Sequence, residues 1–354
     1  MSNKPLSGLK VLELASVLAG PAVGTFLAEL GASVIKIENP KTGGDVTRSW
    51  KLASEDPTSD SSAYFASVNY GKEHRFFDLK VKEDLAQVQQ LASESDIIIA
   101  NYRKGQAERF GLDYKTLRAQ NPKLIYANIT GFGPDESRPA FDVVLQAETG
   151  YMFMNGQPEN EPTKMPVALI DVLAAHQLKE AILLALLNRE KGGEGALVEV
   201  SLFDAAVSAL TNQASNWLMN GHIPQRIGSL HPNIAPYGEI LCTKDDKMIV
   251  LAVGSDAQFA SLCNVLELDG LVTDVRFSTN QQRIENRLVL NQLLQAKAGN
   301  VACGKLMDAF LAKNIPAGVV KNLKDVFESE SAKNLVVEDG QNKRVSQIAF
   351  KISR

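Results

Sequence analysis

The chain has 354 residues, of which 45% are hydrophobic and 22% are charged. This is the composition of a globular protein with room for two domains, or for one large domain with an insertion. A formal charge of −4 and an isoelectric point near 5.7 argue against nucleic acid as a partner.

Targeting and metal signals are weak throughout the sequence. The first residues contain no apolar signal-peptide core, and no apolar run reaches the roughly 18 residues of a membrane span. The three cysteines, Cys242, Cys263 and Cys303, are scattered, and the four histidines do not cluster. We therefore expect a cytoplasmic protein with reduced thiols, no membrane partner and no metal site.

The N-terminal segment has the pattern of a βαβ unit. A buried strand over 9–15 is followed by a turn, a helix over 22–30 that ends at Gly31, and a second strand over 33–38. Such a unit predicts a parallel sheet whose ligand binds at the carboxyl ends of the strands. The turn contains Leu18-Ala19-Gly20-Pro21 and no Gly-x-Gly-x-x-Gly, so it is not a dinucleotide fingerprint.

More strands follow, and polar or basic residues come directly after them. The polar segment 39–62 reads equally well as a functional loop or as plain surface. The pattern then predicts a strand within 68–80, a helix over 83–93, a strand over 96–100 followed by a basic turn, and another strand over 124–129. A single basic residue is usually a solvated one, but several after successive strands favour a ligand site at this edge of the sheet.

Asp171 stands out because every other residue of segment 166–173 is apolar, and a long Ala- and Leu-rich helix is predicted from Leu173 to Arg189. A carboxylate in such surroundings loses hydration, which raises its pKa. Two interpretations are open: Asp171 caps the helix, or it is a reactive carboxylate held at the helix N-terminus. The two roles are compatible.

The second half of the chain changes character after residue 222. A strand is predicted over 196–202 and an amphipathic helix over 203–218, and the Pro- and Gly-rich segment 222–236 is typical of a linker into a second domain. The pattern then predicts a hairpin over 236–253, helices over 256–266, 280–298 and 301–313, and strands over 315–320 and 345–353.

Several motifs resemble those of the family III CoA-transferases, which include formyl-CoA and carnitine-CoA transferases and α-methylacyl-CoA racemase. They occur in the order of that family, and the resemblance covers roughly residues 5–352. They are Leu12-Glu-Leu-Ala-Ser-Val-Leu-Ala-Gly-Pro21, Leu27-Ala-Glu-Leu-Gly-Ala-Ser-Val-Ile-Lys-Ile-Glu38, Gly44-Asp-Val-Thr-Arg48, Asn101-Tyr-Arg-Lys-Gly105, Ile129-Thr-Gly-Phe-Gly-Pro134, His231-Pro-Asn-Ile-Ala-Pro-Tyr237 and Ile315-Pro-Ala-Gly318.

The resemblance implies covalent catalysis by Asp171, which falls on the aspartate that the transferases of the family use. That carboxylate would attack an acyl-CoA thioester and carry the acyl group, then CoA, as aspartyl intermediates until an acceptor carboxylate takes the CoA. Such intermediates require the exclusion of water, which agrees with the apolar sequence around Asp171.

The resemblance also implies a binding site for coenzyme A, which enters as part of the acyl-CoA substrate and not as a permanently bound cofactor. Lys80 and Arg109 would meet the CoA phosphates, and the apolar residues would hold the adenine or the pantetheine arm. The implied contact residues are Leu18, Ala19, Asn39, Phe77, Lys80, Asn101, Tyr102 and Arg109. The second substrate would be a small carboxylic acid.

The fold that the resemblance implies is α/β, with a large Rossmann-like parallel-sheet domain completed by the C-terminal tail and a smaller inserted α+β domain. On this basis residues 1–224 form the large domain, residues 225–325 the small domain, and residues 326–354 the return to the large domain. Two such chains would form an interlocked homodimer.

Two other functions remain open. The racemase branch carries a His before an Asp where this chain has Phe141 and Asp142, and a phenyl ring cannot move a proton, so transfer is favoured over racemisation. A racemase or epimerase that uses Asp171 with some other base, for example Asp142, is the first alternative, and a catalytically silent CoA-binding paralogue is the second. His176 lies off the helical face of Asp171 and is interpreted as structural.

Overall fold

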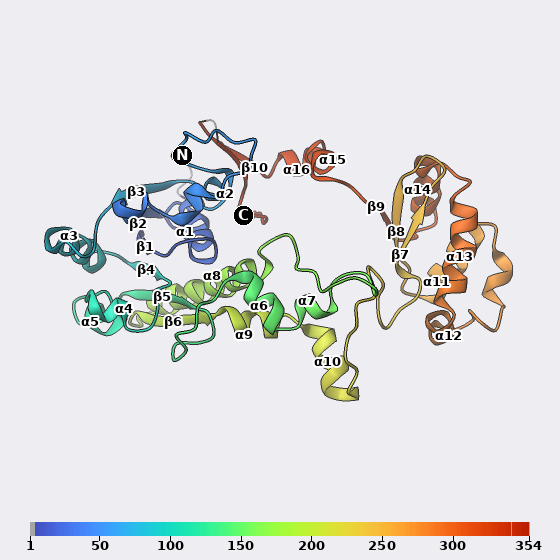
Figure 1. Cartoon of the computed structure of the whole chain (residues 1–354), viewed down its shortest axis with the longest axis horizontal. Coiled ribbons are helices and arrows are strands. Elements are labelled where there is room, and N and C mark those ends of the chain that lie inside the picture. Colours follow the sequence, from blue (N-terminus) through green and yellow to red (C-terminus); the bar gives the residue numbers. More distant parts are fainter. Residues whose placement is uncertain (1–3, 341, 354) are drawn as a thin grey trace. The chain divides into compact units, whose positions relative to one another are not determined.

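The computed structural model describes residues 4–340 and 342–353 and divides the chain into two compact units (Figure 1). Unit 1 holds the residues up to Tyr151, Lys164–Ala214 and the residues from Ser331 onward. Unit 2 holds Met152–Thr163 and Ser215–Glu330. Unit 1 contains the parallel sheet and is therefore the unit in which the ligand site is expected.

The strands and helices alternate through most of unit 1, and the elements of both units are given together here in chain order. The strands are β1 (Lys10–Leu14), β2 (Ser33–Glu38), β3 (Lys72–Phe76), β4 (Ile97–Ala100), β5 (Ile125–Thr130), β6 (Ala196–Ser201), β7 (Tyr237–Cys242), β8 (Met248–Ala252), β9 (Ala317–Val319), β10 (Val336–Asp339) and β11 (Asn342–Val345). The helices of the first half are α1 (Ala19–Glu29), η1 (Pro40–Thr42), η2 (Val46–Ser49), α2 (Ala63–Ser67), α3 (Lys82–Ser93), α4 (Gln106–Arg109), α5 (Tyr114–Arg118), α6 (Asp142–Glu148), α7 (Tyr151–Met154) and α8 (Leu169–Glu190). The later helices are α9 (Leu202–Ser208), α10 (Thr211–Asn220), α11 (Asp256–Val265), η3 (Asp269–Val272), α12 (Asn280–Glu285), α13 (Arg287–Ala298), α14 (Cys303–Ala312), α15 (Leu323–Phe327) and α16 (Glu330–Lys333).

The main sheet of unit 1 has six parallel strands in the order β3-β2-β1-β4-β5-β6. The chain builds outward from β1 to β3, returns to place β4 beside β1, and then builds outward in the opposite direction. This is a doubly wound order whose reversal lies between β1 and β4. The α/β fold with a parallel sheet, predicted from the sequence, is confirmed.

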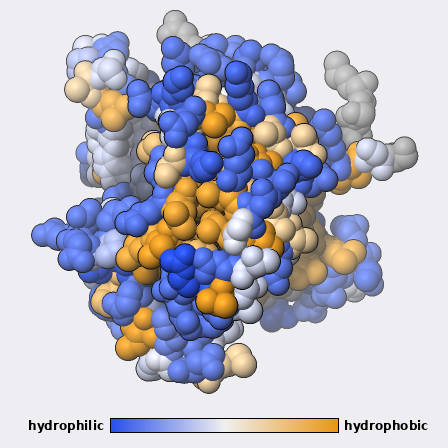
Figure 2. Space-filling model, turned by 90° about the vertical axis from the view of Figure 1, so that its right-hand side faces the viewer, coloured by the Kyte–Doolittle hydropathy of each residue, from blue (hydrophilic) through white to orange (hydrophobic). Residues whose placement is uncertain are grey.

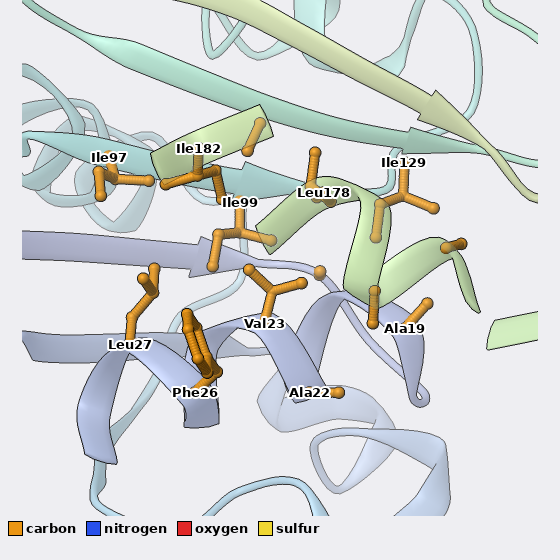
Figure 3. Packing of buried hydrophobic residues seen from close by; sticks show 14 of the residues in the cluster. Ala19, Ala22, Val23, Phe26, Leu27, Ile97, Ile99, Ile129, Leu178 and Ile182 are labelled. Carbon is orange, nitrogen blue, oxygen red and sulfur yellow. The ribbon is translucent and has the colours of Figure 1, made fainter. Parts of the chain in front are cut away.

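Alternate residues of the central strands face opposite sides of the sheet, as the two-residue period of a strand requires. In β4, Ile97 and Ile99 belong to one core cluster, and Ile98 belongs to the other. Figure 3 shows the first cluster, in which side chains of α1 and α8 pack with those of β4 and β5. On the other side, Val88 of α3 and Leu117 of α5 are almost fully buried. Helices on both faces explain why the central strands are apolar at nearly every position.

A glycine in the middle of α1 makes room for a buried charge. Gly24 lies over Glu13 of β1, and a Cβ atom at Gly24 would come within 1.9 Å of the Glu13 carboxylate. Glu13 is excluded from water and forms ion pairs with Lys36 and Lys72 at 2.9 and 2.7 Å. Glycine has an unfavourable helix propensity, but at this position it is the residue that lets α1 pack on the charged cluster.

The C-terminal tail returns to unit 1 through contacts with Glu29 at the end of α1. Arg344 of β11 forms an ion pair with Glu29 at 2.5 Å, and the Ser346 hydroxyl and the Gln347 backbone N–H donate to the same carboxylate at 2.7 and 3.1 Å. Further along, Ile348 packs against the core cluster that α1 and α8 share.

Unit 2 consists of a three-stranded antiparallel sheet, β7-β8-β9, with α11, α13 and α14 packed around it. The predicted hairpin is confirmed, since β7 and β8 pair antiparallel on either side of residues 243–247. Phe259, Phe277 and Phe310 are almost completely buried and form the centre of its own hydrophobic core. Across residues 4–340 and 342–353, each helix is too short or too polar to cross a bilayer.

Three helix predictions were wrong for local reasons: one helix begins earlier than predicted, and two are each divided into two helices. Helix α1 begins at Ala19 instead of 22, because Pro21 fits the first turn, where no intrahelical acceptor exists for its missing N–H. The predicted helix 203–218 is divided into α9 and α10 before Thr211, which has φ +44°. The predicted helix 280–298 is divided at Asn286, whose side chain donates to the Gln282 carbonyl and whose backbone leaves the helical region.

The prediction of a final strand over 345–353 was also wrong. The tail strands lie earlier, with β10 paired antiparallel to β11, and residues 346–353 form no strand. Their backbone and hydroxyl groups bind the Glu29 carboxylate instead, which the apolar alternation of the sequence could not reveal.

The close approach of Gly24 to Glu13 gives a prediction about stability. Gly24→Ala lowers the free energy of unfolding by about 1–3 kcal/mol, because overpacking outweighs the gain in helix propensity. The matched control is Gly304→Ala in α14, where an added Cβ meets nothing within 4 Å, and it is neutral or stabilising by up to about 1 kcal/mol. Urea unfolding followed by circular dichroism measures both. A stabilised Gly24→Ala protein would contradict the packing argument.

Candidate active site

A cavity of about 570 Å³ opens at the carboxyl ends of the strands of unit 1, at the reversal between β1 and β4. Its size is that of a site for a small molecule or for part of a cofactor. It is bordered by residues 16–19 after β1, by residues 101–105 after β4, by most of residues 128–141, and by Asp171 of α8. The position agrees with the general rule for ligand crevices in doubly wound sheets.

The two loops that open the cavity are tied together by one side chain. The Asn101 amide nitrogen donates to the Ser16 carbonyl at 3.0 Å, and its oxygen accepts from the Ser16 N–H at 3.2 Å. Both polar groups of the Ser16 backbone are thus satisfied from the loop of the neighbouring strand. Asn101 therefore fixes the separation of the two loops at the mouth of the crevice.

The loop after β1 has a strained residue next to the cavity. Val17 has φ +74°, a left-handed conformation that is costly for a β-branched residue. Its N–H donates to the Asp45 carboxylate at 3.1 Å, and Asp45 is itself paired with the buried ammonium of Lys36 at 3.1 Å. Asp45 of the Gly44-Asp45-Val-Thr-Arg48 motif thus fixes the loop after β1, which borders the cavity, through its hydrogen bond with Val17.

Asp171 is the third residue of α8, so the helix begins before it and not after it as predicted. The interpretation of Asp171 as the capping residue was wrong. Ala168 occupies the cap position without a side-chain hydrogen bond, and the Asp142 carboxylate accepts a hydrogen bond from the Ile170 N–H at 2.7 Å. Since the Asp142 carboxylate binds this N–H at the start of α8, the Asp171 carboxylate is not needed as a cap, and Asp171 borders the cavity. Among residues 4–340 and 342–353, none donates a hydrogen bond to it.

The surroundings of Asp171 disfavour its charge. The residue is only 8% exposed, and burial, followed by the negative charge of Asp142, raises the pKa of its carboxyl group to about 7. Burial and the nearby charges of Asp171, Asp142 and Asp45 also raise the pKa of the half-buried Tyr64 to about 12. A poorly solvated carboxylate with a raised pKa is a better nucleophile and a better proton acceptor than an exposed one.

The structure brings four of the eight predicted CoA contacts to the cavity and leaves four beside it. Those at the cavity are Leu18, Ala19, Asn101 and Tyr102. The others lie elsewhere at the same sheet edge or on the segment after β4: Asn39 caps η1 after β2, Phe77 follows β3, Lys80 is exposed in the turn before α3, and Arg109 is exposed at the end of α4.

Two residues at or near the site were missed by the sequence reasoning. Arg138 lines the cavity, lies 3.6 Å over the ring of Phe132 and pairs with Glu148 at 2.8 Å. Tyr64 is close enough to Asp171 for its pKa to respond to that charge. Neither belongs to a spacing pattern that points to a ligand, since both come from loop or short-helix segments whose position only the fold decides.

The comparisons with known proteins identify the family of the chain. A sequence model described as CoA-transferase family III matches residues 6–352. The chain belongs to CoA-transferase family III. Three or more potential metal-ligating side chains do not gather anywhere in the described part of the chain.

The relatives of this family III CoA-transferase act on several acids, as their names state. The chain is 38% identical to the succinate–glutarate CoA-transferase of Agrobacterium fabrum over 348 residues, which cover 95% of this chain and 86% of the relative. It is 34% identical to the succinyl-CoA:glutarate CoA-transferase of Mus musculus, with 98% and 79% covered, and to the acetyl-CoA:oxalate CoA-transferase of Acetobacter aceti, with 95% and 86% covered.

Solved structures show the same fold over nearly the whole chain. A CAIB/BAIF family protein from Brucella suis superimposes with a TM-score of 0.86 at 37% identity, covering 99% of this chain and 93% of that one. Rv3272 from M. tuberculosis gives a TM-score of 0.86 at 30% identity, with 99% and 94% covered.

One residue of this CoA-transferase bears on the choice between transfer and racemisation. Phe141 precedes α6, is half exposed and lines the cavity, and its phenyl ring offers no group for proton transfer. Asp142, the other base considered from the sequence, is engaged by the Ile170 N–H and by the Gln146 amide at 2.6 Å.

The raised pKa of Asp171 predicts a pH-dependent cost to the fold. Because the folded protein holds this proton more tightly than the unfolded chain, stability falls as the pH rises from about 4 to 7 and is constant above that range. Asp171→Asn lacks the effect, so its free energy of unfolding relative to the parent rises by up to about 4 kcal/mol between pH 4 and pH 8. Urea unfolding at both pH values measures the change. A difference that does not vary with pH would contradict the assigned burial cost.

Proposed function

We propose that the enzyme transfers CoA from an acyl-CoA donor to a carboxylic acid acceptor through covalent intermediates on Asp171. The observation that carries the proposal is a buried carboxylate, without a hydrogen-bond donor from the described residues, at the border of a cavity of about 570 Å³. A carboxylate used only for structure would have a partner, since an unpaired buried charge is costly.

Each step of the proposed reaction exchanges one acyl bond for another. The Asp171 carboxylate attacks the thioester carbonyl, the C–S bond breaks, and CoA leaves as a thiolate while a mixed anhydride forms. The thiolate then attacks the aspartyl carbonyl, which releases the donor acid and leaves an aspartyl-CoA thioester. The acceptor carboxylate repeats both steps in reverse order and leaves as acyl-CoA, which restores the Asp171 carboxylate.

The loops of the cavity support this chemistry by their position. The first turn of α1 begins at Ala19 beside the cavity, and its N–H groups have no intrahelical acceptor. Such a terminus favours a developing oxyanion or a phosphate. Basic residues at the cavity border are suited to the CoA phosphates; they are Arg103, Lys104, Lys115 and Arg138.

We propose that CoA extends from Asp171 along this edge of the sheet. The pantetheine arm would contact Leu18, Ala19, Asn101 and Tyr102, which border the cavity. The nucleotide end would reach the more distant group, where Lys80 and Arg109 meet phosphates and Asn39 and Phe77 meet the adenine ring. This assignment is supported by their common position after parallel strands or on the segment after β4.

The acids exchanged are short dicarboxylic acids in this proposal. The support comes from the relatives, whose names include succinate, glutarate and oxalate. The names of other relatives add mesaconate and D-citramalate. All five acids carry a second carboxylate that does not take part in thioester formation.

We also propose an interlocked homodimer located in the cytoplasm. Helix α8 leaves Leu183, Leu184 and Leu187 between 40% and 66% exposed. Figure 2, which labels no residue, shows hydrophobic residues gathered near the centre of the face in view. Exposed apolar surface of this kind favours association with a second chain. The three cysteines are free thiols, which agrees with a reducing compartment.

The proposal predicts a covalent adduct on Asp171. Incubation with a panel of acyl-CoAs, including succinyl-CoA and glutaryl-CoA, followed by quenching and peptide mass spectrometry, should show CoA on the peptide that contains Asp171. Hydroxylamine should trap the same residue as a hydroxamate. Asp171→Ala forms neither product and serves as the control. Binding of CoA without an adduct from any donor would overturn the covalent mechanism.

The pH profile of adduct formation gives a second prediction. Formation should fall tenfold for each pH unit below about 7, because only the ionised Asp171 attacks. Asp142→Asn removes the charge that helps raise this pKa and keeps an oxygen for the Ile170 N–H, so the midpoint moves to lower pH. An unmoved midpoint contradicts this coupling. Exchange of the α-proton in deuterated water without an acceptor acid, with transfer absent, would favour the racemase instead.

A further inference from the structure

A second cavity, of about 360 Å³, lies inside unit 1 between α1, α8 and the C-terminal tail. Its walls are mostly apolar, from Leu18 and Ala22 at α1, Val68 after α2, and Val172 and Ala175 of α8. Three cations also border it, Lys179, Lys343 and Arg344, and none of its lining residues is acidic. An apolar cavity with only positive charge is suited to an anionic ligand with a short hydrocarbon part.

Lys179 differs from the other two cations because it has no carboxylate partner within ion-pair distance among the described residues. Lys343 pairs with Glu338 at 2.7 Å and Arg344 with Glu29 at 2.5 Å. Lys179 is 5% exposed, donates to the neutral Gln347 amide oxygen at 3.0 Å, and lies 5.1 Å from the Phe26 ring centroid.

Burial disfavours the charged form of this ammonium. Burial lowers the pKa of Lys179 to about 8. A lysine has three N–H donors, and the Gln347 amide nitrogen carries two more that no described residue accepts. An incoming carboxylate would supply both the missing charge and the missing acceptors.

The second cavity adjoins the place of the chemistry. Leu18 borders both cavities, and Asp171 and Val172 are successive residues that border one each. Lys179 is eight positions after Asp171 in α8, about 12 Å along the helix axis. Long side chains on a helix point back toward its N-terminus, so the ammonium is directed toward the turn that carries Asp171.

We propose that the second cavity receives the far end of a dicarboxylic acyl group, and that Lys179 binds its free carboxylate. This inference rests on the proposed function, because it requires the near carboxyl group to react at Asp171. The distance suits a chain of about four to six carbons, since the aspartate and lysine side chains span the rest. Lys179 is thus a specificity residue and takes no part in the bond exchange.

Equilibrium binding tests the proposal without turnover. Glutarate and valerate have the same length and differ by one carboxylate, and calorimetric titration compares them on the full chain. We expect glutarate to bind Lys179→Met at least tenfold more weakly than the parent, while valerate binds both equally or prefers the variant. The matched control is Lys343→Met, which borders the same cavity with an exposed and already paired side chain and should change glutarate binding less than threefold.

A second variant protects the test against a folding defect. Lys179→Arg keeps the positive charge and should keep a preference for glutarate, and circular dichroism checks that each variant is folded. Affinity for glutarate should also fall above pH 8 as Lys179 loses its proton. Equal losses for glutarate and valerate, or no loss for either, would overturn the proposal.

The kinetic readout separates this inference from the proposed function. In Lys179→Met the adduct on Asp171 should still form from butyryl-CoA, whereas formation from succinyl-CoA falls at least tenfold. If both donors react equally in the variant, the second cavity is not the acid site, although Asp171 remains the nucleophile. If the parent protein forms no adduct from any donor but retains Lys179-dependent glutarate binding, the covalent mechanism fails and the binding site stands.

Discussion

The geometry of the active-site cavity depends on a cluster of buried charges below the loop that follows β1. Lys36 pairs with Glu13 at 2.9 Å and with Asp45 at 3.1 Å, and Lys72 completes the cluster at 2.7 Å from Glu13. Burial lowers the pKa of Lys72 to about 7, which shows how little water reaches this region. Removing one member would leave another charge buried without a partner, a loss of about 3–5 kcal/mol. Since Asp45 also holds the N–H of Val17, the stability of the core and the shape of the loop have the same origin.

Hydrogen-bond donors also distinguish Asp171, the nucleophile in our proposal, from the nearby acids. Asp45 and Asp142 are comparable carboxylates, but each accepts hydrogen bonds from backbone N–H groups, at Val17 and Ile170 respectively. Asp171 has burial without such donors, together with the negative field of Asp142, so its pKa rises to about 7. The fold thus gives the stabilising contacts to the acids that hold the loops and withholds them from the one that faces the cavity. Destabilisation of a functional group by its own environment is the usual cost of an active site.

The sequence predicted the sheet and the apolar surroundings of Asp171 because both depend on short-range pattern. Strand β2 was predicted with its observed bounds, and the isolated polar residue in an apolar segment identified Asp171. The capping role of Asp142, by contrast, joins residues 28 positions apart, and the bonds from Asn101 to Ser16 join residues 85 positions apart. Such contacts leave no periodicity in the sequence. The end of the chain was misjudged for the same reason, because Ser346 and Gln347 bind Glu29 more than 300 residues away.

Lys179 shows what a pattern alone conceals. In the sequence it is one lysine in an Ala- and Leu-rich helix, where the ordinary expectation is a solvated side chain. In the structure Gln347 of the tail accepts one of its hydrogen bonds. Among the described residues, the acid whose charge acts on Lys179 is Glu29, and this carboxylate is already bound by Arg344 and by the backbone of the tail. The tail therefore borders the cavity and also occupies the carboxylate that could otherwise pair with the lysine. A fold that buries an ammonium in this way keeps it available for an anion from outside. In our proposal that anion is the second carboxylate of an acid whose first carboxyl group reacts at Asp171.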